Sequence, residues 1–297
     1  PPEQVVEGRL YVQGTKSLSC RDVYTGRVLW QREFESLGTD DLYFDATYKD
    51  TPLDTAYNQV HIPGANGRGT NYVVRPDAIY LAIGSDCLVL DPLSGKTLRK
   101  TVLPASGGED RQWGYIGVYE DVLLAGNGFA DFRSRHNLKF TEYDKDLKRN
   151  SLGFGSKSFD VSASAGLIAF DRHTGEQLWQ LDARHSFLHN GIVAGNGRVY
   201  CLDKMPKPVE EQLKRRGRDS PDSYQIVAVD VLTGERILQN SDAVFGTWLS
   251  YSTEHDLLLQ AGASASDRLK SEIGAGMAVL NGSDGRIKWR DDKRAYS

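Results

Sequence analysis

A few residues of this 297-residue chain have types and spacings that could support chemistry. His185 and His189 form an H-x-x-x-H pair, which on a helix would place two imidazoles on one face and could hold a zinc ion. The surrounding residues instead predict a connection between two strands, where this spacing fixes no ligand geometry. No C-x-x-C pair accompanies them. We therefore predict no metal site.

Three further patterns match catalytic or nucleotide-binding motifs only in part. Ser94-Gly95-Lys96-Thr97 corresponds to the end of a phosphate-binding loop, but the first glycine of that motif is absent. The nucleophile-elbow pattern G-x-S-x-G does not occur. The segment 281–285 is similar to a sialidase Asp-box, but Trp289 lies one place too far along. These patterns favour neither nucleotide binding nor a hydrolase.

Polar and aromatic side chains gather at the predicted starts of several strands. They are Asn71, Trp113, His189, Asn190 and Trp248. If these starts surround one channel, the side chains could bind a ligand at its mouth; the alternative is that they satisfy exposed strand ends. With Arg133 and His136 of the basic, aromatic segment 131–165, they form our candidate ligand or partner site. We expect replacement of Trp113 and His189 to leave stability nearly unchanged.

A short helix is predicted near residues 208–217. Proline opens it, glutamates occupy its first turn, basic residues its last, and Gly217 closes it. The basic cluster at its end, Lys214, Arg215, Arg216 and Arg218, could contact carboxylates of a partner. The alternative is a solvated helix end whose charge suits the helix dipole.

Five copies of one pattern organise the chain. In each, an apolar strand is followed by Asp or Asn, then four residues later by Gly, and in three copies by Trp four residues after that. The Asx residues are Asp22, Asp91, Asp171, Asp230 and Asn281; the glycines are Gly26, Gly95, Gly175, Gly234 and Gly285; the last positions hold Trp30, Arg99, Trp179, Leu238 and Trp289. The Asx side chain can accept backbone hydrogen bonds and Gly permits positive φ, so each copy predicts a hairpin. We expect the three tryptophans to be buried between neighbouring units.

Two more strand candidates precede each copy, so each unit has four antiparallel strands, A to D. Repeated four-stranded units of this kind predict an all-β fold, a β-propeller, as one domain spanning 1–297. We expect the five blades to be part of a larger ring of six to eight. The predicted blades are approximately 1–34, 71–104, 113–183, 189–240 and 247–292, and the insertions are 35–70, 131–165, 204–224 and 264–276.

The insertions all fall on one side of the predicted propeller. Because the strands alternate in direction, the A–B and C–D turns share one face and the B–C and D–A connections share the other. The A–B and C–D turns are all short, whereas every long connection is of the second kind. Long connections often carry function. We therefore place binding on the insertion face.

The pattern A-x-D-x-x-T-G-x-x-x-W resembles the tryptophan-docking repeat of the PQQ-type propellers, which have a WD40-like architecture. That superfamily includes the quinoprotein alcohol dehydrogenases and a non-catalytic outer-membrane assembly lipoprotein. The resemblance implies a bacterial protein exported to the periplasm or cell envelope. Catalytic members carry an adjacent cysteine pair and a calcium-binding set. Cys20, Cys87 and Cys201 are not neighbours, so we predict neither PQQ nor calcium as a cofactor, and three buried thiols.

Composition narrows the choice of function. The chain has 36 Lys and Arg against 40 Asp and Glu, a formal charge of −4, which argues against a nucleic-acid partner. No apolar run approaches the roughly 20 residues of a membrane span. The sequence favours a non-catalytic binding or scaffolding module whose insertion face takes a protein or an extended polar ligand, with further domains of the same polypeptide as candidate partners. The alternative is a quinoprotein-like or other propeller enzyme acting on a sugar or alcohol at the channel mouth.

Overall fold

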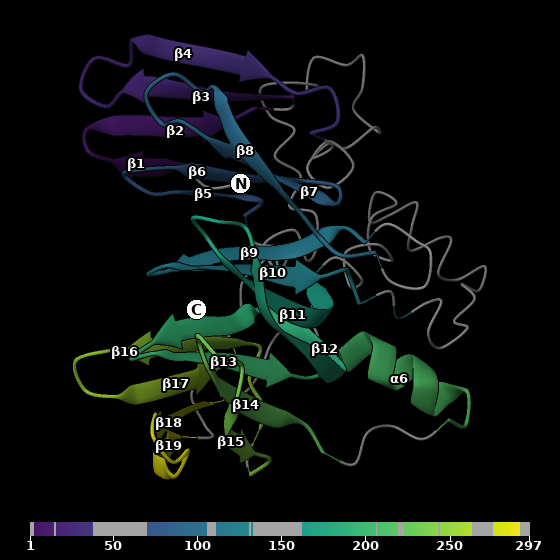
Figure 1. The fold of residues 1–297 in the computed structure, drawn as a ribbon. Helices are drawn as coiled ribbons and strands as arrows, with labels where there is room; N and C mark the ends of the chain where they lie inside the picture. The colour runs from purple at the N-terminus through teal and green to yellow at the C-terminus, as the bar shows by residue number, and fades with distance from the viewer. Residues whose placement is uncertain are drawn as a thin grey trace, which may run out of the picture.

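Short antiparallel strands make up almost all of the regular structure. The computed structural model describes residues 3–14, 16–37, 70–105, 111–130, 132, 162–205, 207–218, 223–242, 244–262 and 276–291. Within these residues the strands form sheets that follow one another through the molecule, from β1–β4 at one end to β16–β19 at the other (Figure 1). Each sheet is one blade, or two joined blades, of a β-propeller, which confirms the predicted fold class.

Blades 1, 2 and 5 are separate four-stranded sheets in which each strand pairs with the next along the chain. Blade 1 contains β1 (Gln4–Val6), β2 (Arg9–Gln13), β3 (Ser17–Asp22) and β4 (Val28–Glu33). Blade 2 contains β5 (Tyr72–Val74), β6 (Ile79–Ile83), β7 (Asp86–Leu90) and β8 (Thr97–Val102). Blade 5 contains β16 (Trp248–Ser252), β17 (Leu257–Ala261), β18 (Met277–Asn281) and β19 (Ile287–Asp291).

Blades 3 and 4 are joined into one seven-stranded sheet. Its strands are β9 (Trp113–Tyr119), β10 (Val122–Asn127), β11 (Ala163–Asp171), β12 (Gln177–Gly195), β13 (Arg198–Asp203), β14 (Gln225–Asp230) and β15 (Arg236–Asn240). The 19-residue strand β12 is the last strand of blade 3 and the first of blade 4. The connection predicted around His185 and His189 is therefore wrong: Phe187, between them, pairs with β11 on one side and β13 on the other.

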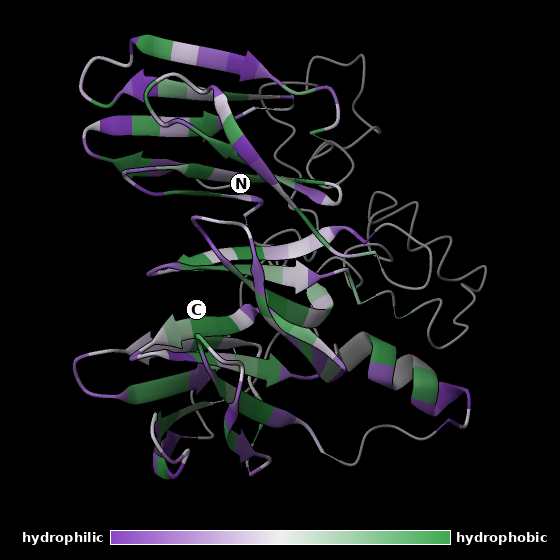
Figure 2. Cartoon of the chain, viewed as in Figure 1, coloured by the Kyte–Doolittle hydropathy of each residue, from purple (hydrophilic) through white to green (hydrophobic). Residues whose placement is uncertain are grey.

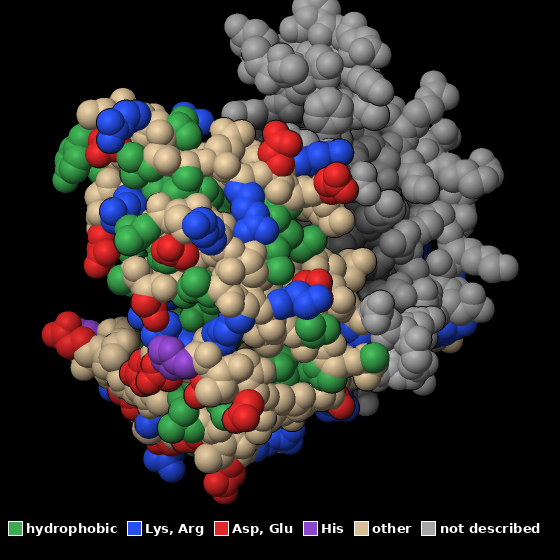
Figure 3. Space-filling view, turned by 45° about the horizontal axis from the view of Figure 1, so that its top comes forward, with side chains coloured by type: hydrophobic (Ala, Val, Ile, Leu, Met, Phe, Trp, Pro, Cys, Tyr) green, Lys and Arg blue, Asp and Glu red, His purple; other side chains and the backbone are tan. Residues whose placement is uncertain are grey.

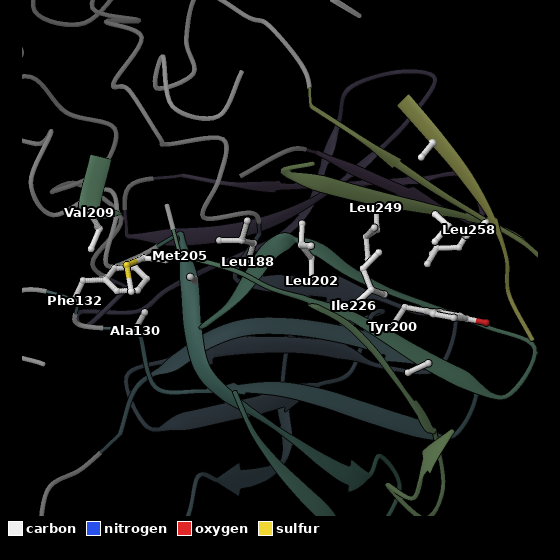
Figure 4. Packing of buried hydrophobic residues seen from close by; sticks show 14 of the residues in the cluster. Ala130, Phe132, Leu188, Tyr200, Leu202, Met205, Val209, Ile226, Leu249 and Leu258 are labelled. Atoms are coloured by element: carbon white, nitrogen blue, oxygen red, sulfur yellow. The ribbon is translucent and has the colours of Figure 1, made fainter. Parts of the chain in front are cut away.

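The core is divided into layers between successive blades. Strands such as β14 and β17 are mostly hydrophobic, whereas the outer strand β4 mixes polar and apolar residues (Figure 2). The layer between blades 4 and 5 brings Tyr200, Leu202 and Ile226 against Leu249 and Leu258 (Figure 4). The three cysteines are buried free thiols, as predicted.

Four C–D turns, those of Asp22, Asp91, Asp171 and Asp230, have the predicted hydrogen-bond pattern. The Asp171 carboxylate accepts bonds from the backbone N–H groups of His173 and Thr174 at 2.8 and 2.7 Å. Asp22, Asp91 and Asp230 accept equivalent bonds in their own turns, and the five turn glycines all have φ between 69° and 79°. These bonds lower the pKa of the turn aspartates. For Asp171 the hydrogen bond from the Thr174 N–H has the largest effect on the pKa.

The turn carboxylates make stability depend on acid pH. A lowered pKa in the folded state means that the ionised carboxylate stabilises the fold above the ordinary aspartate pKa of about 4, and that this stabilisation is lost as the pH falls below it. We expect the melting temperature to fall as the pH is lowered through that range. Asp171→Asn keeps an acceptor oxygen but does not titrate. On acidification its melting temperature should therefore fall less than that of the wild type, and an equal fall would contradict this account.

Tryptophan docking between blades follows one geometry. The indole N–H of Trp30 donates to the carbonyl of Pro92 at 2.9 Å, and that of Trp179 to the carbonyl of Val231 at 2.8 Å. Both acceptors are the residue after the Asx of the next blade. A Cβ added to Gly95 or Gly234 would lie 2.7 or 2.6 Å from the indole, so the turn must be glycine on steric grounds as well. Trp179 is buried, as predicted, whereas Trp30 is only half-buried.

Trp289 corrects the prediction that all three tryptophans are buried. Its side chain is 45% exposed, against 7% for Trp179. Both occupy the same register position on the last strand of a blade, opposite Val279 and Ala169 respectively. Their neighbours differ, because Trp179 contacts the turn of blade 4, whereas among the described residues no sixth blade covers Trp289.

Leu238 replaces the docking tryptophan of blade 4. It lies 2.9 Å from the Cβ position of Gly285 in the blade 5 turn. Beside it is a surface hollow of about 430 Å³, lined by residues of both blades including Asn240, Asp284 and Arg286. The Asn240 side-chain amide, in the lining of this hollow, donates to the Gly285 carbonyl at 2.7 Å. The smaller side chain therefore leaves an incompletely filled docking site.

We expect Leu238→Trp to stabilise the propeller. The indole would fill part of this hollow and could donate to the Gly282 carbonyl as Trp179 does to that of Val231, and cavity-filling changes of this kind commonly contribute about 1 kcal/mol. The melting temperature should rise. Leu178→Trp, on the exposed side of β12, is the matched control and should give no rise; a rise in both would indicate a nonspecific effect.

Candidate functional site

The two edges of the blades are built differently. On one, the A–B and C–D turns are bonded together, as when Arg172 N–H donates to the Asp121 carbonyl and Val231 N–H to that of Gly197, both at 2.9 Å. The opposite edge carries helix α6 (Lys207–Arg215), which projects from the sheets (Figure 1). Of the predicted insertions, residues 38–69, 133–161 and 263–275 lie outside the described residues, and so do Arg133 and His136.

Trp113 is part of the packing between blades 2 and 3. Its indole N–H donates to the Ser85 carbonyl at 2.9 Å, and its ring stacks on Phe170 with centroids 5.9 Å apart. The side chain is 5% exposed. The expectation that Trp113→Ala leaves stability unchanged is therefore wrong, because the change would open a cavity in this layer.

His189 lies in a tightly packed pocket inside the joined sheet. Its Nε2 is 2.8 Å from Ser164 Oγ, and its ring lies beside those of Tyr115 and Phe129. A serine–histidine pair can act as nucleophile and base, but only where a substrate can reach the hydroxyl. Ser164 is 0% and His189 3% exposed. Ser164 Oγ also packs so closely against Gly126 that a Cβ at that position would collide with it. The pair is a buried hydrogen bond, so replacement of His189 is also expected to destabilise.

The remaining candidate residues do not converge on one point. The Asn71 side chain donates to the Ala82 carbonyl at 3.5 Å, within blade 2. Asn190, in β12, and Trp248, in β16, are half-buried. His185 packs edge-on against Tyr224 at 5.6 Å, and no group of three potential metal ligands occurs among the described residues. The structure joins His189 to Ser164, but it places Trp113 and Asn71 in other layers.

Sequence reasoning missed Asp203, the most highly bonded buried carboxylate in the described part of the chain. It is 1% exposed and accepts bonds from the backbone N–H groups of Arg184, His185 and Ser186 at 2.8 to 3.0 Å, and from Gln225 Nε2 at 2.9 Å. The three backbone donors lie where β12 shifts register between its two neighbours. Asp203 thus replaces the strand partner that β12 lacks there. Its place at the end of an apolar strand gave no signal in the sequence.

Helix α6 is anchored beside this cluster. Val209 and Leu213 are 4% and 3% exposed and join the core layer of Met205 and Phe132 (Figure 4). Lys214 is paired with Glu210 at 2.8 Å. The helix ends at exposed Arg215, and exposed Arg216 follows it before Gly217 at φ 65°. The predicted short helix is confirmed, and its apolar side fixes the direction in which its basic end points.

The repeat and its blade geometry are shared with known proteins. A family profile described as "Outer membrane protein assembly factor BamB" matches residues 148–292. Quinohemoprotein alcohol dehydrogenase ADHIIG from Pseudomonas putida HK5 aligns with a TM-score of 0.54 at 14% identity, over 98% of this chain and 41% of that one. The chain is a β-propeller, and the profile match covers just under half of it. A search of curated proteins gave no match.

Two more structures illustrate the extent of the match. Quinohemoprotein alcohol dehydrogenase from Comamonas testosteroni aligns with a TM-score of 0.53 at 14% identity, over 98% of this chain and 42% of that one. BamB from Moraxella catarrhalis aligns with a TM-score of 0.48 at 13% identity, over 99% and 64%. The propeller therefore spans less than two thirds of the length of each of these structures. No helix among its described residues is long and apolar enough to cross a membrane.

Proposed function

We propose that this PQQ-type propeller is a non-catalytic protein-binding module, and that it binds through the edge opposite the short turns. The observation that carries the proposal is the anchored helix α6, whose buried Val209 and Leu213 hold exposed Arg215 and Arg216 out from that edge. Binding residues are commonly presented from connections fixed by a rigid scaffold. The name of the matching profile supports protein assembly in the cell envelope as the setting.

The chemistry of this edge favours an acidic or extended polar protein segment. Arginine side chains suit carboxylates because the guanidinium can form two parallel hydrogen bonds. Elsewhere on the surface, charges of both signs lie side by side with apolar patches, as on the face drawn in Figure 3. Recognition would therefore depend on local groups at the α6 end rather than on the overall charge.

The alternative function is catalysis with a quinone at the channel mouth, favoured by the alignment with quinohemoprotein dehydrogenases. Against it, the candidate channel residues Trp113 and His189 are buried and hydrogen-bonded within the fold. Optical titration of the purified chain with PQQ and Ca²⁺ separates the two functions. Saturable quinone binding would support the enzyme, and its absence the binding module.

Partner capture tests the proposed edge directly. Arg215→Glu with Arg216→Glu reverses the charge of two exposed side chains, so the melting temperature should change little. We expect the double variant to lose the proteins that the wild type captures from an envelope extract of its host. The control reverses two exposed charges on the short-turn edge, Arg27→Glu with Lys96→Glu, and should capture normally. Loss of capture only in the control would place binding on the other edge.

A further inference from the structure

The last strand of each blade meets the C–D turn of the next blade through two side chains, four and six residues after its own turn glycine. From the blade 1–2 interface to the blade 4–5 interface, these pairs are Trp30 and Arg32, Arg99 and Thr101, Trp179 and Leu181, and Leu238 and Asn240. Only the last pair contains neither tryptophan nor arginine. The surface hollow of about 430 Å³ described above lies at that interface.

Arginine side chains of this chain bind the next blade's turn at two of the interfaces. Arg32 Nη1 donates to the Gly95 carbonyl at 3.0 Å and to Thr97 Oγ1 at 2.7 Å. Arg99 Nη1 donates to the His173 carbonyl, in the turn of blade 3, at 2.7 Å. The outer rim of a blade interface is therefore a place where a guanidinium group binds.

Asn240 reproduces only part of the contact that Arg32 makes. Its Nδ2 donates to the Gly285 carbonyl at 2.7 Å, as Arg32 donates to the equivalent Gly95 carbonyl. Its Oδ1 accepts the backbone N–H of Asp242, also at 2.7 Å. The two bonds fix the short amide on the wall of the hollow. The hollow thus corresponds in position to the space that the longer Arg32 side chain occupies between blades 1 and 2.

Carboxylates line the hollow where the blade 1–2 interface has uncharged side chains. Asp242 stands at the position of Phe34, whose ring centroid is 4.7 Å from the guanidinium carbon in blade 1, and Asp284 at the position of Ser94. Arg286 also lines the hollow, but its side chain is 85% exposed and its Nε lies 3.7 Å from Asp284 Oδ2. It extends into solvent and leaves the hollow open.

We propose that the hollow between blades 4 and 5 binds an arginine side chain presented by a partner protein. Asp242 and Asp284 would accept hydrogen bonds from the guanidinium, whose planar arrangement of donors suits carboxylates better than the single ammonium of lysine does. Leu238 and Ile287, also in the lining, would contact its methylene groups.

The openness of the site favours a side chain of a protein over a free small molecule. Sites for small ligands usually enclose most of the ligand surface, whereas this hollow lies at the surface between two outer strands. It contains residues of β15 and of the blade 5 turn and none of helix α6. The inference therefore goes beyond the function proposed for the α6 edge, and either can fail without the other.

The first experiment titrates N-acetyl-L-arginine methylamide into the 15N-labelled 297-residue chain and follows the side-chain amide NMR signals of Gln239 and Asn240. We expect saturable shifts of these signals, and none with the uncharged citrulline analogue. Asp242→Asn with Asp284→Asn keeps acceptor oxygens and should weaken binding about tenfold, since each exposed ion pair contributes up to about 1 kcal/mol.

The matched control makes the same change of charge on exposed residues of blade 3, Glu176→Gln with Asp182→Asn. It should bind the arginine probe as the wild type does. Absence of saturable shifts, equal binding of the citrulline analogue, or equal weakening in the two double variants would overturn the proposal.

The second experiment supplies the guanidinium from the chain itself. Asn240→Arg should place its side chain in the hollow as Arg32 is placed in blade 1, and so abolish binding of the arginine probe without lowering the melting temperature. Asn240→Gln adds length but no charge and should still bind it. Unchanged binding in Asn240→Arg would overturn the proposal. Tighter binding of free L-arginine than of the capped residue, or equal binding of N-acetyl-L-lysine methylamide, would overturn it as well.

Discussion

Trp179→Ala is expected to lower the free energy of unfolding by about 3 to 5 kcal/mol, the usual cost of truncating a large buried aromatic side chain. The indole fills the layer between blades 3 and 4, contacts Gly234 and donates to the Val231 carbonyl. Its removal leaves a cavity and an unpaired carbonyl in the same place. Urea unfolding monitored by circular dichroism measures the loss.

Trp289→Ala is the matched control for this prediction. The residue type and the register position are the same, but the side chain is 45% exposed, so we expect a change within about 0.5 kcal/mol. Equal losses in the two variants would show that docking against the next blade is not what makes Trp179 important.

Asp203→Ala is expected to cost about 3 to 5 kcal/mol, because it leaves several buried donors without an acceptor. The backbone N–H groups of Arg184, His185 and Ser186 all donate to this carboxylate, and Gln225 does so as well. We expect a cooperative loss of stability measured by urea unfolding. Hydrogen exchange should show the fastest new exchange at residues 184–186.

Asp182→Ala provides the comparison within the same strand. Its side chain is exposed and accepts one bond, from Gln180 at 3.0 Å. We expect a change within about 0.5 kcal/mol. If Asp203→Ala were equally mild, β12 would be held across the two blades by its strand pairing alone.

The fold could be predicted because its rules are local. An Asx residue, a glycine at positive φ and alternating strand residues act within a few positions of one another, and each of the five hairpins carries them. The tryptophan offset also predicts docking, but burial needs a neighbouring blade, and for this reason Trp289 departs from the prediction made for Trp179.

The candidate site was harder to predict because it depends on contacts between distant strands. His189 and Trp113 are polar or aromatic residues at predicted strand starts, a pattern shared by ligand sites and by packing contacts. Only the partners, Ser164 for His189 and Ser85 for Trp113, distinguish the two. No sequence pattern identifies Asp203, because its role arises from a register shift in β12 that no local rule encodes.

The continuity of β12 bears on how such a protein gains and loses repeats during evolution. A fold tolerates a recombination breakpoint best where the breakpoint separates complete structural units. Between blades 1 and 2 a breakpoint separates two sheets, but between blades 3 and 4 it would cut a strand that pairs on both sides at Phe187. Blades 3 and 4 are therefore expected to be duplicated, deleted or exchanged as a pair, so repeat number in related chains should change by two at this position and by one elsewhere.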